Sequence, residues 1–259
     1  MTIDTIVDTA RYPLANEAFR LSCHETLDRT GVIVMRRFLK PAIVEAIRRE
    51  GEDRRNLAYF CRQEHNVYLT PPDENYPADH TRNRIVVSSK GCITDDVIPA
   101  ESPLRALYNS EDFRGFLCRV LDEPSLYEYA DPLSSINLHY YESGQELGWH
   151  FDNSSFAVTL MIREPEKGGA FEYVAGMRDA DTDEMNFDGV EKVLNGDIRP
   201  QRLNMDAGAL VLFRGRNAIH RVAPVEGSRT RMLVVLAYNT EPGISLSESA
   251  RMTFFGRLN

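Results

Sequence analysis

Apolar residues recur at helical intervals through the first half of the chain. The helices that this pattern predicts cover residues 16–31, residues 40–63 and two stretches within residues 102–121. Gly31 ends the first helix, Pro41 lies in the first turn of the second, and Ser110 is the expected N-cap of the last. The apolar run 32–39 predicts a short strand, and residues 70–84, rich in Pro, Asp and Asn, predict an irregular loop.

From about residue 125 the pattern changes to short β-type runs separated by Gly, Pro and Asn. These runs are residues 126–130, 135–141, 156–162, 170–176, 209–213, 220–225 and 231–239. An acidic segment, residues 178–196, interrupts them and predicts an insertion with a short helix over one face of the strands.

Regularly spaced short strands of this kind indicate a closed all-β core. We therefore expect an α+β fold in which a double-stranded β-helix (a jelly-roll, cupin-like core) is supported by a helical N-terminal layer. The expected organisation is one domain over residues 1–259, with 1–124 mainly helical support and 125–259 forming the β-helix core.

Composition restricts the class of protein further. Hydrophobic residues make up 42% and charged residues 27% of the 259 positions, as in ordinary globular proteins. The net charge of −9 disfavours non-specific binding to nucleic acid or to anionic membranes. Four cysteines without CxxC spacing, no secretory signal and no long apolar run lead us to expect a cytoplasmic protein with reduced thiols.

The candidate chemistry begins in LGWHFDNSSF, residues 147–156. His150 and Asp152 are two positions apart, so on a strand both side chains leave the same face. Roughly one such pair is expected by chance in a chain of this composition, and the pair alone also fits a solvated strand end. His220 follows the apolar run GALVLF, where a partner strand brings it across. Two imidazoles and one carboxylate form the facial triad of non-haem Fe(II) oxygen chemistry, and no thiolate is present to favour zinc.

An arginine with the right placement follows the second histidine. Fe(II) that activates oxygen needs electrons, which a chelating keto acid supplies if a cation holds its far carboxylate. Arg229 lies at the entry to the next strand and Arg231 shares its face, and a guanidinium binds a carboxylate bidentately. A surface charge in a turn is the alternative reading of Arg229.

With these elements in order, the chain resembles the Fe(II)/2-oxoglutarate-dependent oxygenases. YESGQELGWHFD, GALVLFRGRNAIHRVAPVEGSR and MLVVLAY follow the core pattern of that superfamily over about residues 133–240. The stretches PDENYPADHTRNR and EPGISLSESARMTFFGR are similar to the BesD-type amino-acid halogenases and their hydroxylase relatives. The resemblance implies Fe(II), 2-oxoglutarate and O2 as cofactors.

The resemblance also implies roles for individual residues. His150, Asp152 and His220 would bind iron, and Arg229, with Arg231 beside it, would hold the distal carboxylate of 2-oxoglutarate. Tyr141, in the Y-x-x-G element, would donate a hydrogen bond to the co-substrate, although a core aromatic residue fits the same pattern. Asn137 is assigned to the cofactor site because it lies on the same strand. In the related halogenases a small residue replaces the metal-binding carboxylate and leaves a site for chloride, whereas this chain has Asp152.

We therefore expect a dioxygenase that oxidises an unactivated C–H bond, by hydroxylation, in a free amino acid or a small amino-acid-derived metabolite, and releases succinate and CO2. Desaturation or cyclisation in natural-product biosynthesis and a peptide-directed hydroxylase remain open alternatives. A cupin-like metal binder without turnover is disfavoured because it has no need for the arginine. The expected partner is a small molecule, not nucleic acid or membrane, and a homodimer is compatible with these observations.

Residues that contact the substrate are less well defined by the sequence. His80 and Arg82, in HTRNR, lie in a loop that we expect to cover the site, although a solvated basic loop fits equally. Asn153 follows the metal aspartate, and Trp149 lines the pocket mouth or packs on the barrel. His65 and His139 have no partner that the pattern identifies, so we interpret them as structural.

Overall fold

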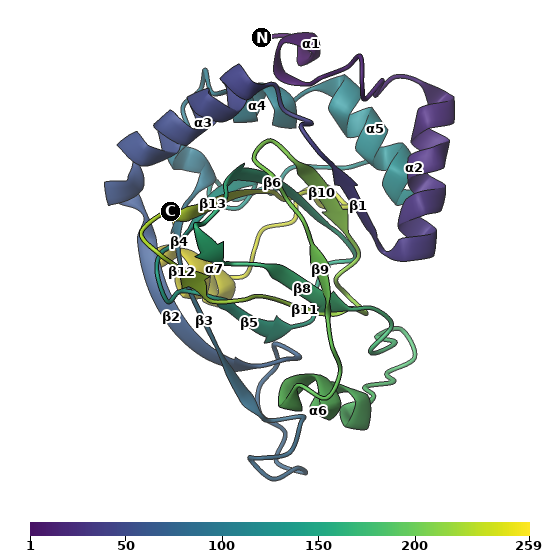
Figure 1. The fold of residues 1–259 in the computed structure, drawn as a ribbon, viewed down its shortest axis with the longest axis vertical. Helices are drawn as coiled ribbons and strands as arrows, with labels where there is room; N and C mark the ends of the chain where they lie inside the picture. Colours follow the sequence, from purple (N-terminus) through teal and green to yellow (C-terminus); the bar gives the residue numbers. More distant parts are fainter.

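Two antiparallel β-sheets form a jelly-roll in the computed structural model, which describes residues 1–259 (Figure 1). The larger sheet has the order β1 (Val32–Met35), β10 (Leu210–Phe213), β6 (Ala157–Arg163), β13 (Arg231–Leu236), β4 (Ile136–Tyr141), β3 (Ile85–Ile93) and β2 (Tyr59–Asn66). The smaller sheet has the order β5 (Leu147–His150), β11 (Ile219–Val222), β8 (Phe171–Val174) and β9 (Gln201–Leu203), and a separate pair joins β12 (Val225–Glu226) to β7 (Lys167–Gly168).

Most of the helices lie together on one side of the larger sheet (Figure 1). The helices are α1 (Ile3–Ile6), α2 (Glu17–Thr30), α3 (Pro41–Asp53), α4 (Pro103–Tyr108), α5 (Glu111–Leu121), α6 (Phe187–Asn195) and α7 (Glu248–Phe255), with 3-10 turns at η1 (Arg55–Leu57) and η2 (Asp95–Val97). Of these, α1 to α5 cover the sheet, whereas α6 and α7 lie elsewhere in the fold (Figure 1).

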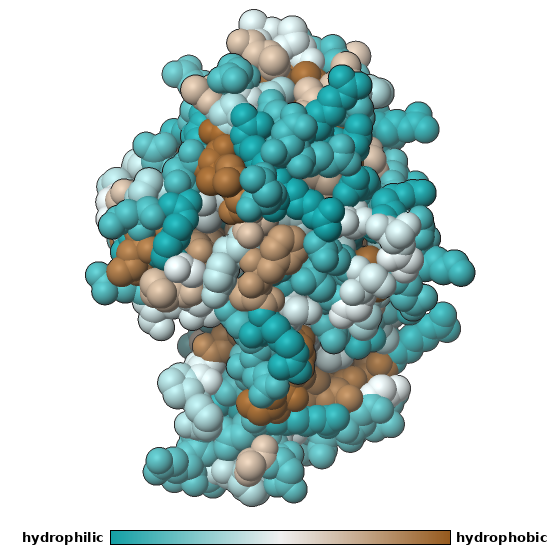
Figure 2. Space-filling view, turned by 90° about the vertical axis from the view of Figure 1, so that its left-hand side faces the viewer, coloured by the Kyte–Doolittle hydropathy of each residue, from teal (hydrophilic) through white to brown (hydrophobic).

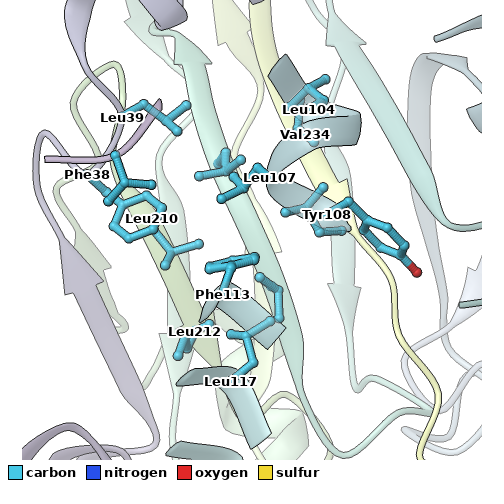
Figure 3. Close-up of a cluster of buried hydrophobic side chains, with 14 of the residues drawn as sticks. Phe38, Leu39, Leu104, Leu107, Tyr108, Phe113, Leu117, Leu210, Leu212 and Val234 are labelled. Carbon is cyan, nitrogen blue, oxygen red and sulfur yellow. The ribbon is translucent and has the colours of Figure 1, made fainter. Parts of the chain in front are cut away.

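The main hydrophobic core fills the space between these helices and the sheet. Figure 3 shows Leu107 of α4 and Phe113 of α5 gathered with Leu210 and Leu212 of β10, and all four side chains are fully buried. Burial of a side chain of this size stabilises the fold by roughly 1.5–3 kcal/mol. Because one face of each strand is used in this way, the alternate positions of the same strands face the interior of the jelly-roll.

The helix boundaries expected from sequence are confirmed at three positions. Gly31 ends α2 in the left-handed conformation, with φ 72°. Pro41 is at the start of α3, and the Ser110 hydroxyl accepts a hydrogen bond of 3.3 Å from the backbone N–H of Phe113 at the start of α5.

The expected helix over residues 40–63 is wrong in its second half. Helix α3 ends at Asp53, and the chain then forms β2, which pairs with β3 along its whole length. Neither strand is apparent from the sequence, because β3 contains Ser-Ser-Lys-Gly and β2, at the sheet edge, is polar from Arg62 to Asn66. Both strands therefore extend the larger sheet with residues expected to be helical support or loop. In the second half, residues 126–130 form only the isolated bridge between Tyr127 and Asn239.

The insertion and the 70–84 loop pack on each other outside the smaller sheet. Arg84 donates hydrogen bonds to Asn195 Oδ1 (2.6 Å) and to the Leu194 carbonyl (3.3 Å) at the end of α6. Trp149, Phe151 and Ile219 form the adjoining apolar cluster with Val67, Tyr68 and residues of α6. The expected short helix over one face of the strands is thus present as α6.

No helix has the length and apolar character needed to cross a bilayer. Figure 2, which views the side that carries α3 and β2, shows a mostly hydrophilic face with separate hydrophobic patches.

Helix α3 approaches the sheet so closely at Gly51 that a side chain there should destabilise the fold. A Cβ at this position would lie 2.4 Å from Leu138 Cδ2 and 2.6 Å from Met232 Cε, both in the packed core. We expect Gly51→Ala to lower the free energy of unfolding by about 1–3 kcal/mol relative to Gly115→Ala, measured by urea denaturation. Gly115 in α5 meets only Arg20 at 3.6 Å, so equal stability of the two variants would refute this account of the close approach.

Candidate metal centre

His150 and His220 are brought together by the pairing of β5 with β11, in which they are directly opposite each other. Both imidazoles therefore leave the same face of the smaller sheet and enter the jelly-roll. Asp152 lies just beyond β5, and its backbone N–H donates to the Gly215 carbonyl (3.1 Å). Asp152 Oδ1 is 3.6 Å from His150 Nε2 and 3.4 Å from His220 Nε2, and the candidate ligand atoms all lie within 4.8 Å of one another.

Backbone carbonyls orient both imidazoles for metal binding. His150 Nδ1 is 2.8 Å from the Gly148 carbonyl, and His220 Nδ1 is 2.9 Å from the Ala218 carbonyl. A carbonyl only accepts, so each Nδ1 carries the proton and each Nε2 lone pair points towards Asp152. This is the arrangement in which an outer hydrogen bond sets the tautomer of a metal-binding histidine.

The electrostatics of the three side chains fit a bound cation. Burial and the adjacent His220 ring lower the pKa of His150, which favours the neutral, ligating form. Burial alone would raise the pKa of Asp152, but the imidazoles of His220 and His150 outweigh it and hold the pKa well below its usual value. Asp152 Oδ2 is buried without a hydrogen-bond partner, so the carboxylate presents an unsatisfied oxygen that a metal ion would satisfy.

Gly215 makes room for this carboxylate. A Cβ at residue 215 would lie 1.9 Å from Asp152 Oδ2 and 2.9 Å from His220 Cε1. Any side chain at this position would therefore displace the carboxylate from the two imidazoles.

A second unsatisfied group lies inside the jelly-roll. Arg231, on β13, is completely buried, and none of its three guanidinium nitrogens has a hydrogen-bond partner. Its guanidinium carbon is 5.1 Å from the ring centroid of Tyr141, the residue opposite it on β4. Burial lowers the pKa of Arg231, as expected for a guanidinium without a counter-ion. A carboxylate bound here would supply that counter-ion, so the donor set fits 2-oxoglutarate.

The structure corrects the expected role of Arg229. This residue is exposed in the turn between β12 and β13, whereas Arg231 is the arginine that enters the interior. Arg229 precedes β13, whereas Arg231 is its first residue, and its side chain leaves the interior face of the strand.

Asn137 and Asn153 do not have the features expected of ligand-binding residues. The Asn137 amide donates both its protons to backbone carbonyls, those of Leu133 (2.7 Å) and Ile136 (3.0 Å), and thus stabilises the start of β4. Asn153 is exposed in the loop after β5, where its carbonyl accepts a 3.4 Å hydrogen bond from Arg216.

His80, Arg82 and Trp149 lie on the opposite side of the smaller sheet from the metal cluster. The His80 ring stacks on Tyr76 at 4.4 Å and meets Phe187 of α6 at 5.1 Å. Arg82 lies over Tyr68, which belongs to the same outer apolar cluster as Trp149. These three residues pack the 70–84 loop and α6 on the outer face, and their assignment to the substrate stays a prediction.

Two interior residues were not identified as functional from the sequence. His139 is buried on β4 between Asn137 and Tyr141, and Lys90 of β3 contacts its ring. The period-two spacing of His139 from Tyr141 was the available signal, because it places both side chains on the interior face. His65 is partly buried: its Nε2 is 2.7 Å from the Ser88 hydroxyl, which accepts from the Gly148 N–H (3.0 Å) and so supports β5.

Comparison with known proteins places this site in a family. A model of the family described as halogenase D matches residues 15–253. No curated protein matches the chain in sequence. Among solved structures, an oxidoreductase of the 2OG-Fe(II) oxygenase family from Burkholderia pseudomallei aligns with TM-score 0.54 and 12% identity, over 89% of this chain and 95% of that one. SnoK, an alpha-ketoglutarate-dependent carbocyclase from nogalamycin biosynthesis, aligns with TM-score 0.59 and 14% identity, over 89% of each chain. A Pseudomonas putida prolyl-4-hydroxylase aligns with TM-score 0.51 and 15% identity, over 83% of this chain and 96% of that one.

The jelly-roll, the His-Asp-His cluster and the family match define a non-haem Fe(II)/2-oxoglutarate-dependent dioxygenase, with Fe(II), 2-oxoglutarate and O2 as its cofactors. Within that class, the chain belongs to the halogenase D family. It differs from the halogenase pattern by retaining Asp152.

Metal binding at the cluster should stabilise the fold. At a hundred times its dissociation constant, a ligand adds about 2.7 kcal/mol, which corresponds to an increase of about 5–10 °C in Tm for a chain of this size. We expect Mn(II) with 2-oxoglutarate to give this increase in differential scanning calorimetry and His220→Ala to abolish it. His80→Ala is the control that keeps the increase, and an undiminished increase in His220→Ala would place the metal elsewhere.

Arg231, and not Arg229, should control the affinity for 2-oxoglutarate. Removing one partner of a buried charge pair costs about 2–5 kcal/mol, so we expect Arg231→Met to raise the KM for 2-oxoglutarate at least about 30-fold. Arg229→Met should change it less than about twofold, because an exposed charge contributes little. Initial rates of succinate release and anaerobic binding of 2-oxoglutarate measure both variants, and the reverse ranking would restore Arg229 as the anchor.

Proposed function

We propose that this enzyme hydroxylates an unactivated C–H bond of a free amino acid or a small amino-acid-derived metabolite. The observation that supports this proposal is the position of the Asp152 carboxylate, 3.4 Å and 3.6 Å from the two ligating nitrogens. With a carboxylate as third protein ligand, the coordination position that a halide would need is already filled. Hydroxylation is therefore favoured over halogenation for this member of the halogenase D family.

Each interior residue has a defined task in this reaction. His150, Asp152 and His220 would hold Fe(II) on one side and leave the other side open to ligands. Arg231 would bind the distal carboxylate of 2-oxoglutarate bidentately, with Tyr141 beside it as a hydroxyl donor. When bound, Fe(II) with 2-oxoglutarate and O2 supplies an oxidant strong enough to remove hydrogen from such a bond, with release of succinate and CO2.

Aromatic side chains exclude water from the protein side of the cluster. Phe171 stacks on the His220 ring with centroids 5.4 Å apart, and Phe213 meets it edge-on at 4.9 Å. These rings fix the imidazole and keep its surroundings apolar, which protects a reactive site from side reactions with water.

The retained carboxylate is equally compatible with desaturation or cyclisation, since the same hydrogen removal precedes each outcome. Among similar folds, one structure is described as a carbocyclase and another as a prolyl hydroxylase, so the fold itself does not separate these reactions. A peptide-directed hydroxylase is a further candidate. We also propose a reducing, cytoplasmic setting, which suits Fe(II) and the four free cysteines.

Product analysis tests the proposed reaction. Purified enzyme with Fe(II), 2-oxoglutarate and O2 is screened against free amino acids in the presence of chloride, with succinate release and product mass as the measurements. We expect one or a few compounds to stimulate succinate release and to gain 16 mass units, with no chlorinated product.

Asp152→Ala is the matched variant for this screen. Loss of a ligand should weaken Fe(II) binding at least about tenfold, because loss of an outer hydrogen bond to a ligand alone costs 10- to 100-fold. Substrate-stimulated succinate release should fall with it. A chlorinated product from the unmodified enzyme would refute the proposed reaction, and a loss of 2 mass units would replace hydroxylation by desaturation or cyclisation.

A further inference from the structure

Lys90 and His139 form a cationic pair inside the jelly-roll, beside the site already described. His139 is only 9% exposed, and Lys90 Nζ lies 3.3 Å from its Nδ1 and 3.4 Å from its Nε2. Because the two distances are nearly equal, the ammonium is aligned with the lone pair of neither nitrogen. The ammonium N–H groups of Lys90 therefore remain available to donate hydrogen bonds to a ligand.

No carboxylate neutralises Lys90. It forms no ion pair, and its other close neighbour is the ring of Phe254 on α7, 5.8 Å away. On the interior face, Lys90 alternates with Ser88 and Cys92 along β3, and His139 alternates with Tyr141 along β4. The carboxylate of Asp152 faces the two metal-binding imidazoles and forms no ion pair with Lys90.

A structural role does not explain this arrangement. Burial, Lys90 and Arg231, in that order, hold the pKa of His139 well below its usual value, so the imidazole is neutral and offers no compensating charge. A partly buried ammonium without a counter-ion destabilises the fold, and a contact with Phe254 compensates only in part. An anion that binds here would remove that destabilisation.

The charges of the cofactors leave Lys90 unbalanced. The two positive charges of Fe(II) and the one of Arg231 match the single negative charge of Asp152 and the two of 2-oxoglutarate. Arg231 is opposite Tyr141 on β4, while His139 lies two residues along the same strand, with its ring centroid 6.4 Å from that of Tyr141. Lys90, at His139, is thus displaced along β4 from the Arg231 fork at Tyr141, and a second carboxylate would balance its charge.

We propose that Lys90 and His139 form a second anion subsite, which binds the carboxylate of the substrate. This inference rests on the proposed function and narrows its substrate class to compounds with a free carboxylate. Lys90 supplies the charge, and the neutral imidazole of His139 supplies a hydrogen-bond donor or acceptor beside it. Decarboxylated amines, carboxamides and residues within a peptide lack the group that this subsite binds.

A binding experiment tests the subsite without turnover. Enzyme loaded with Mn(II) and 2-oxoglutarate under anaerobic conditions is titrated with an equimolar pool of the twenty proteinogenic amino acids, and separately with a pool of their carboxamides. We expect the acid pool alone to raise Tm, and Lys90→Met to abolish the difference between the pools. Lys90→Arg should preserve it, and Lys192→Met, which removes an exposed lysine from α6, should leave it unchanged. The proposal is overturned if both pools change the Tm of the unmodified enzyme equally, or if neither pool changes it.

Kinetics under air separate the failure of this proposal from that of the proposed function. We expect Lys90→Met to raise the KM for the stimulating acid at least tenfold, with the KM for 2-oxoglutarate unchanged. A parallel rise in the KM for 2-oxoglutarate would assign Lys90 to the co-substrate and overturn the subsite. Absence of any Fe(II)- and 2-oxoglutarate-dependent succinate release in the unmodified enzyme would instead overturn the proposed function itself.

Discussion

The pairing of His150 with His220 across β5 and β11 is the contact on which the site depends. Strand side chains alternate between faces, so a shift of one residue would turn an imidazole to the outer face of the smaller sheet. That face is already filled by Trp149, Phe151 and Ile219, which pack against the insertion and the 70–84 loop. Burial of these apolar side chains outside the sheet thus selects the register that brings the ligands together inside it.

The interior of the jelly-roll is built to receive anions. It contains the positively charged Arg231 and Lys90, whereas the carboxylate of Asp152 faces the two neutral, ligating imidazoles. Such an excess of positive charge destabilises the empty protein, because charges interact more strongly where water is excluded. Binding of co-substrate and an anionic substrate relieves the repulsion among these positive charges, and this gain in free energy favours binding. The same preorganised charges orient the ligands with little further rearrangement.

The sequence predicts the parts of this site that depend on local periodicity. Period-two spacing and chain order were enough for His150, Asp152 and His220, and capping residues located the ends of α2 and α5. Strands β2 and β3 were not predictable in this way, since they are stabilised by pairing with each other more than by their own composition. The side of a sheet on which a loop lies is a tertiary property, so the packing of the 70–84 loop against α6 could not be predicted from the sequence.

The roles of Arg231 and Asp152 each depend on a second residue, Arg231 on its position relative to Arg229 and Asp152 on Gly215. Arg229 and Arg231 are two positions apart, but Arg229 precedes β13 and is exposed, whereas Arg231 is the first residue of β13 and is buried. Asp152 similarly depends on Gly215, because a Cβ there would lie 1.9 Å from its carboxylate oxygen. A chain with a small residue at position 152 has no such need for glycine at 215. The combination of Asp at 152 and Gly at 215 is therefore a more specific indicator of a three-ligand metal site than the aspartate alone, because it records both the ligand and the space the ligand requires.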